Sequence, residues 1–138
     1  MTGLLRWLLL LMGAACTAIG AAHLVAGVHS VPGEGLAGAT VDSRERFYGA
    51  IFMGYGLAWI HVARRSPIPA RAVRWLAGLL LLGGAGRLLS LLSHGPPHWF
   101  QVVLTGTELL LPPLFLWLAA VEEKAASTAG RAAPDSNN

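Results

Sequence analysis

The most constraining feature of the sequence is an apolar stretch from Gln101 to Ala120 that is interrupted by one carboxylate, Glu108. A helix of about 20 apolar residues is long enough to cross the hydrocarbon core of a bilayer. Three further apolar stretches each carry a polar or ionisable residue, namely His23, Tyr55 and Arg87. A charge in hydrocarbon costs roughly 2.5 to 3.5 kcal/mol on insertion scales, so it persists where it has a partner or a task. We therefore expect a membrane protein with a polar interior.

The apolar stretches predict the fold class. Of the 138 residues, 54% are hydrophobic and only 12% are charged, which excludes an ordinary soluble domain. We predict an all-α integral membrane protein, a bundle of four transmembrane helices joined by short connections, with Asp42 or Ser43 capping the second helix. The predicted spans are residues 4–28, 45–63, 73–92 and 99–121, which make up one domain at 1–121, and a disordered cytoplasmic tail follows at 122–138.

The basic residues predict the orientation. Arg64, Arg65 and Arg71 lie in the connection between the second and third spans, and Lys and Arg are enriched on the cytoplasmic side of membrane proteins. We therefore expect both termini, which carry Arg6 and Lys124, to be cytoplasmic. The net charge of +3 comes from arginines at the ends of apolar segments, a distribution that argues against a nucleic-acid partner.

Three of the predicted spans repeat one spacing of unusual residues, alternately four and three positions apart. This spacing places each set on one helix face, and that face should turn toward the interior of a bundle. The sequence therefore predicts a polar seam along the inside of the bundle. In chain order the three sets are Cys16, Gly20, His23 and Gly27; Gly83, Arg87, Ser90 and His94; and Gln101, Thr105, Glu108 and Pro112.

Arg87 and Glu108 should lie at similar depths, because about 1.5 Å of helix rise per residue places both in the outer half of the bundle. We expect them to form an ion pair, since an unpaired charge there would be costly. The pair serves either as part of a functional site or as a purely structural lock on helix register. His23 is either a second proton carrier or a structural group bonded to a backbone carbonyl or to Ser90.

The remaining candidate site residues surround this pair. Tyr55 would orient a ligand oxygen, and Asp42, Glu45 and Arg46 stand at the outer rim. We predict no metal site and no cofactor, because the spacing HxxE is missing from the sequence and the one HxxxH spacing, His94 to His98, flanks a predicted turn rather than lying on a helix face. The predicted catalytic set is Glu108, His23, Arg87 and Tyr55, and the predicted ligand-binding set is Arg46, Glu45, Asp42, Ser90, Thr105 and Gln101.

Several segments together are similar to a bacterial membrane family known as domain of unknown function 4345. They are Asp42 to Ala50 continued by Gly54-Tyr55-Gly56, the run Gly84-x-Gly86-Arg87-Leu88-Leu89-Ser90, the Gly95-x-Pro97 turn, Glu108 followed by Pro112, and Ala22-His23. The resemblance covers residues 4–118. It implies a four-helix protein of the bacterial inner (cytoplasmic) membrane, and it implies no activity.

Three functions are compatible with the residues. The first is a non-catalytic protein that binds a lipid-like or apolar small molecule, or accompanies a membrane complex. The second is a cofactor-independent membrane enzyme of the isomerase, cyclase or epoxide-opening type, with Glu108 as acid or base. The third is a small transporter or proton pathway, which would need a homo-oligomer because four helices enclose little lumen. In each case the expected partners are membrane lipids or an apolar small molecule.

Overall fold

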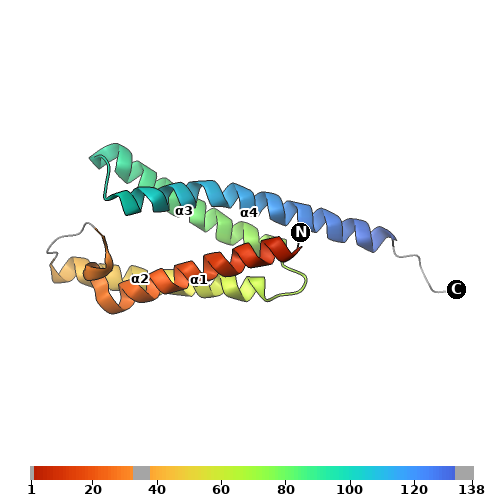
Figure 1. Ribbon diagram of the computed structural model, residues 1–138, viewed down its shortest axis with the longest axis horizontal. Coiled ribbons are helices and arrows are strands. Elements are labelled where there is room, and N and C mark those ends of the chain that lie inside the picture. The colour runs from red at the N-terminus through yellow and green to blue at the C-terminus, as the bar shows by residue number, and fades with distance from the viewer. Residues whose placement is uncertain (1, 33–37, 133–138) are drawn as a thin grey trace.

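The computed structural model describes residues 2–32 and 38–132, and in these ranges the chain is helical and contains no strand (Figure 1). The helices are α1 (Thr2–Ala26), the short 3-10 helix η1 (Gly27–Ser30), α2 (Ala39–Ala63), α3 (Ala70–His94) and α4 (Trp99–Ala132). The all-α prediction is therefore confirmed.

Three of these helices are long and apolar enough to cross a membrane: α1 extended through η1 (Gly3–Ser30), α3 (Ala70–His94) and α4 (Trp99–Thr128). The second helix, α2, has similar length but lower hydropathy. Its first turns carry the charged residues Asp42, Arg44, Glu45 and Arg46, and His61 lies near its end. The chain is thus a helical protein with three segments that suit a bilayer.

The α1 and α2 helices form a tightly packed antiparallel hairpin. Glycines spaced seven residues apart on each helix meet across it, Gly13 near Gly56 and Gly20 near Gly49. A Cβ atom added at Gly20 would lie 2.3 Å from the Met53 nitrogen, and one added at Gly56 would lie 2.4 Å from the Thr17 nitrogen. Small residues let transmembrane backbones approach closely, so these glycines set the spacing of the hairpin.

The α3 and α4 helices form the second hairpin. Gly95 closes the turn between them with φ of 86°, a value that favours glycine. Farther along, Gly84 faces α4 at the level of Glu108, where an added Cβ would lie 3.0 Å from the Glu108 Cβ. Close helix approach at Gly84 therefore holds Glu108 against α3.

The two hairpins meet at one end of the molecule and diverge toward the other. Figure 1 shows them converging near the N-terminus and separated at the end that carries η1 and the α3–α4 turn. At the converging end Trp59 packs against Phe115 with the rings tilted by 41° and their centroids 4.9 Å apart, and Arg6 Nη2 donates to the Arg65 carbonyl at 3.2 Å. The other fully or mostly buried members of this core are Leu5, Leu9, Val62, Ala63, Val73, Leu76, Ala77, Leu118 and Ala119.

Two predicted boundaries were wrong. Helix α2 begins at Ala39 rather than near Glu45, and its N-cap is Gly38, so neither Asp42 nor Ser43 caps it. Asp42 instead accepts a hydrogen bond from the Val28 nitrogen at the end of α1. The polar connection predicted between the first two spans covers residues 30–44, and its residues 33–37 lie outside the described residues.

The second boundary concerns the tail, which was predicted to be disordered from residue 122 but is helical through Ala132. Alanine favours helix, and Ala125 and Ala126 continue α4 without interruption. An ion pair between Arg74 of α3 and Glu123 also anchors the start of this extension. Residues 133–138 lie outside the described residues.

A polar cavity between the two hairpins

The diverging ends of the hairpins enclose a cavity of about 770 Å³ that all four long helices line. The helices bring together most of the predicted site residues there, although they come from distant parts of the sequence. Those on the cavity wall are His23, Glu45, Tyr55, Arg87, Ser90, Gln101, Thr105 and Glu108.

Arg87 and Glu108 form the predicted ion pair across the α3–α4 hairpin. Arg87 Nε donates to Glu108 Oε1 at 3.2 Å and lies 2.9 Å from Oε2. Oε2 accepts no hydrogen bond despite this short contact, so it is held by charge attraction alone. The Glu108 side chain is 9% exposed and the Arg87 side chain 39% exposed. The carboxylate is therefore the buried member of the pair, and the guanidinium faces the cavity.

Gln101 completes this polar wall. Arg87 Nη1 donates to the Gln101 side-chain carbonyl, which fixes the guanidinium from its other side. Thr105 lies between Gln101 and Glu108 on α4, and its hydroxyl donates to the Gln101 backbone oxygen at 2.8 Å. Arg87 lines the cavity, and within the described residues no acceptor bonds to its Nη2, so this donor is free to bond a ligand.

His23 stands on the opposite wall, at the end of α1. Its Nδ1 atom lies 2.8 Å from the Ser30 hydroxyl oxygen. The partner is thus Ser30 and not Ser90, which the sequence suggested as one alternative. The seven-residue separation of His23 and Ser30 spans a helix end, and only the 3-10 turn of η1 folds Ser30 back onto His23.

Tyr55 lies where the two hairpins come together. Its hydroxyl donates to the Leu76 carbonyl of α3 at 2.5 Å, and its ring stacks on Phe52 and contacts Trp59 edge-on. Because the hydroxyl proton is already donated to a backbone oxygen, Tyr55 can offer a ligand only an acceptor lone pair. Its main structural effect is to tie α2 to α3.

Two predicted ligand-binding residues, Asp42 and Arg46, do not line the cavity. Arg46 Nε lies 2.8 Å from Asp42 Oδ2, and Arg46 Nη1 donates to the Leu24 and Val25 carbonyls at the end of α1. The Arg46 guanidinium, together with the Val28 nitrogen, lowers the pKa of the Asp42 carboxyl. These contacts satisfy backbone groups that a helix end leaves without partners. The pair therefore links the first turns of α2 to the end of α1.

The sequence reasoning missed the apolar part of the cavity wall. Ordinary apolar and aromatic residues carry no signal in a span that is apolar throughout, so only the structure identifies them. His98, at the α3–α4 turn, also faces the cavity, whereas His94 does not line it. The further apolar and aromatic lining residues include Ile19, Tyr48, Ile51, Phe52, Leu79, Leu80, Phe100 and Leu104.

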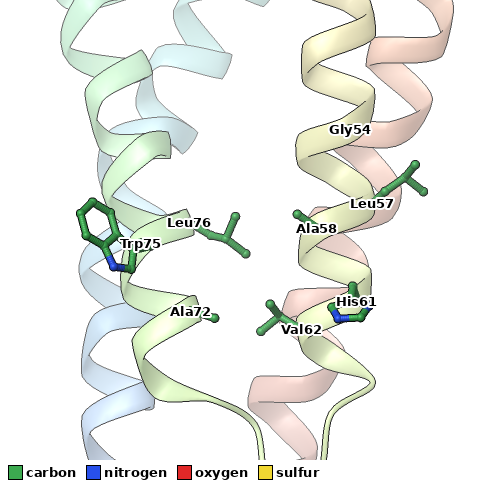
Figure 2. A pocket seen from close by; sticks show the side chains of 8 residues that line it. All are labelled: Gly54, Leu57, Ala58, His61, Val62, Ala72, Trp75 and Leu76. Atoms are coloured by element: carbon green, nitrogen blue, oxygen red, sulfur yellow. The ribbon is translucent and has the colours of Figure 1, made fainter.

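A second hollow of about 730 Å³ lies between α2 and α3. Figure 2 shows Leu76 of α3 and Val62 of α2 directed toward each other there, while Trp75 points away. The lining is apolar apart from His61. Tyr55 lines the polar cavity and Leu76 lines this hollow, so the hydrogen bond between them joins the two walls.

The fold and the cavity define a small helical membrane protein with a polar site between two helical hairpins. The family described as "Domain of unknown function (DUF4345)" matches residues 4–119, and the chain belongs to this family. No curated protein and no solved structure matches the chain. The family description assigns no activity.

Proposed function

We propose that the protein binds a lipid-like amphiphile in the cavity between the hairpins. The observation that carries the proposal is the composition of the wall: Arg87, Gln101 and Glu108 form a polar patch, and Phe52 and Leu80 lie in the same cavity. Small-molecule sites usually have volumes of about 300 to 1,000 Å³ and combine apolar walls with a few placed polar groups. A cavity of about 770 Å³ lies within this range.

The polar part of the ligand would contact the polar groups of the cavity wall, which include His23 on α1 and Arg87 on α3. Arg87 Nη2 is a donor without an acceptor in the described structure, and it lies beside a buried carboxylate that holds the guanidinium in place. The apolar part would pack against side chains such as Ile51 and Leu79. Since the walls are apolar helices suited to a bilayer, the ligand would enter from the membrane.

We also propose that the chain lies in the bacterial inner membrane with α2 as the fourth span. Both termini would then be cytoplasmic. Support comes from Arg64, Arg65 and Arg71, which lie at the converging end of the hairpins, because basic residues favour the cytoplasmic side. The cavity would then open in the outer half of the bilayer.

A cavity-filling substitution tests the binding proposal. Gly83 lines the cavity, and an added Cβ there would meet nothing within 4 Å, so the side chain of Gly83→Leu would occupy part of the cavity. Gly86→Leu is the matched control, because Gly86 also has open space but does not line the cavity. Lipids that copurify with each variant would be measured by mass spectrometry at equal protein amounts. Loss of a lipid in Gly83→Leu alone supports the proposal, and identical lipid profiles contradict it.

A second candidate function is a cofactor-independent enzyme acting on a hydrophobic substrate. It is favoured by one observation: Glu108 and His23, two groups able to carry protons, line the same cavity. Isomerisation, cyclisation or epoxide opening would suit such a site. In a deletion strain complemented with Glu108→Gln at wild-type abundance, accumulation of a precursor would support catalysis. Unchanged metabolite profiles would leave binding as the function.

A further inference from the structure

The Ser30 hydroxyl determines which nitrogen of His23 carries a proton. Ser30 Oγ donates to the Gly27 carbonyl oxygen at 2.7 Å and also lies 2.8 Å from His23 Nδ1. A carbonyl oxygen can only accept, and a hydroxyl has one proton. The Ser30 proton is therefore directed to Gly27, and the contact with His23 requires a hydrogen on Nδ1.

The other ring nitrogen is then an acceptor. A neutral imidazole carries a hydrogen on one nitrogen and a lone pair on the other, so hydrogen on Nδ1 leaves the lone pair on Nε2. His23 is partly exposed and lines the cavity, and within the described residues nothing donates to its Nε2. His23 thus offers the ligand an acceptor, opposite the donor offered by Arg87.

The charges around the cavity select against an anion. Among the described lining residues Arg87 is the one permanent cation, and it is already paired with Glu108. Glu45 adds a second carboxylate at the rim, and no described residue forms an ion pair with it. Apart from the histidines, the wall carries two carboxylates, Glu45 and Glu108, against one guanidinium. A phosphate headgroup would therefore be repelled, whereas an uncharged group would not.

We infer that the ligand is an uncharged lipid with a hydroxyl group, such as a long-chain alcohol, and that this hydroxyl donates to His23 Nε2. The inference rests on the proposed binding function and specifies the chemical class of the ligand. The acceptor on His23 requires a donor on the ligand, and the charge balance requires that the donor be neutral. A hydroxyl meets both conditions.

The test compares three probes that share one alkyl chain: hexadecanol, hexadecyl methyl ether and hexadecyl phosphate. Each would compete with radiolabelled hexadecanol for the full-length protein in nanodiscs of fixed lipid composition. We expect the alcohol to bind roughly three- to tenfold more tightly than the ether, the range for one net hydrogen bond. The phosphate should bind more weakly than the alcohol. In His23→Phe the preference for alcohol over ether should disappear.

Ser30→Ala supplies an independent readout, because it removes the group that determines the tautomer. Nitrogen-15 NMR of histidine-labelled protein should show hydrogen on Nδ1 of His23 in the wild type and a shift toward Nε2 in Ser30→Ala. Equal binding of alcohol and ether, tighter binding of the phosphate, or hydrogen on Nε2 in the wild type would overturn the inference.

The binding proposal and the inference fail in different ways. If alcohol and ether bind equally and Gly83→Leu weakens both, the cavity binds lipids and only the role of the hydroxyl is wrong. If wild type binds none of the three probes above the Gly83→Leu background, the inference and the binding proposal both fall. The Gly86→Leu variant should match the wild type in every comparison.

Discussion

Arg87 and Glu108 form an ion pair whose two members are buried to different degrees, with the carboxylate 9% exposed and the guanidinium 39% exposed. The difference arises because Gly84 lets α4 approach α3 at Glu108, while the longer arginine extends from α3 toward Gln101 and the cavity. Glu108 is therefore held in the helix interface, whereas Arg87 remains accessible from the cavity.

This asymmetry predicts unequal effects of removing each partner. Arg87→Met should leave a buried carboxylate without its cation, whereas Glu108→Gln leaves a guanidinium that still reaches Gln101 and the cavity. Loss of one member of a fully buried pair costs about 3 to 5 kcal/mol, and partial exposure should reduce this to about 2 kcal/mol for Arg87→Met and less for Glu108→Gln. Thermal unfolding of the purified variants measures the difference. The double variant should recover most of the loss, and equal losses in the two single variants would contradict the asymmetry.

The glycine contacts predict which substitutions separate the first hairpin. An added Cβ at Gly20 would lie 2.3 Å from a backbone nitrogen, which cannot rotate away, so Gly20→Ala should destabilise the protein by roughly 1 to 3 kcal/mol. Gly54→Ala is the control, since its added methyl meets nothing within 4 Å. That variant should be unchanged or more stable by up to about 1 kcal/mol, because alanine favours helix. Unfolding midpoints that rank the two variants in the opposite order would refute the proposed packing.

The Asp42–Arg46 ion pair predicts that the stability of the fold depends on pH in the acidic range. The hydrogen bond from Arg46 is the largest cause that lowers the pKa of Asp42 in the folded state. A carboxyl whose pKa is lower when folded stabilises the fold fully above its unfolded pKa, about 3.9, and loses this contribution as the pH falls through the lower folded value. Unfolding midpoints measured during acid titration should therefore fall less steeply for Asp42→Asn than for the wild type. If the unfolding midpoints of the two proteins fell in parallel, the ion pair would contribute nothing to the pH dependence of stability.

The orientation predicts which sites an impermeant thiol reagent reaches. The only cysteine, Cys16, is buried, so Cys16→Ser gives a background for single cysteines. Thr40→Cys and His94→Cys lie at exposed positions on one side of the proposed membrane, and Ser66→Cys lies at an exposed position on the other. In intact spheroplasts the first two should be labelled and Ser66→Cys only after lysis. Labelling of Thr40→Cys and Ser66→Cys from the same side would show that α2 does not cross.

Sequence patterns were sufficient for the helices and for the polar pair. Apolar segments of bilayer length predict helices because backbone groups in hydrocarbon must be bonded within the segment. The cost of an isolated charge there predicts that Arg87 has a partner, and Glu108 was the carboxylate at matching depth. These inferences depend on local composition and helical periodicity alone.

The roles of individual polar residues were harder to predict from the sequence. Asp42 and Arg46 are charged residues of the kind that bind ligands, yet they bond to backbone groups at the end of α1. His23 bonds to Ser30, and Tyr55 bonds to the Leu76 backbone. Each partner is a group whose position depends on a turn or on the docking of two helices, so the spacing of residues could not reveal it.

The sequence by itself determined that this chain is built from apolar helices and that its few charges must be paired, because both follow from the energetics of burying backbone and charge in hydrocarbon. The tertiary structure alone decided that the helices form two hairpins that diverge at one end. Close contact at Gly20 and Gly49 holds the first hairpin, Gly84 holds the second, and the Trp59–Phe115 core joins them at the other end. The cavity exists because these contacts are distributed unequally along the helices, a property of packing between distant segments.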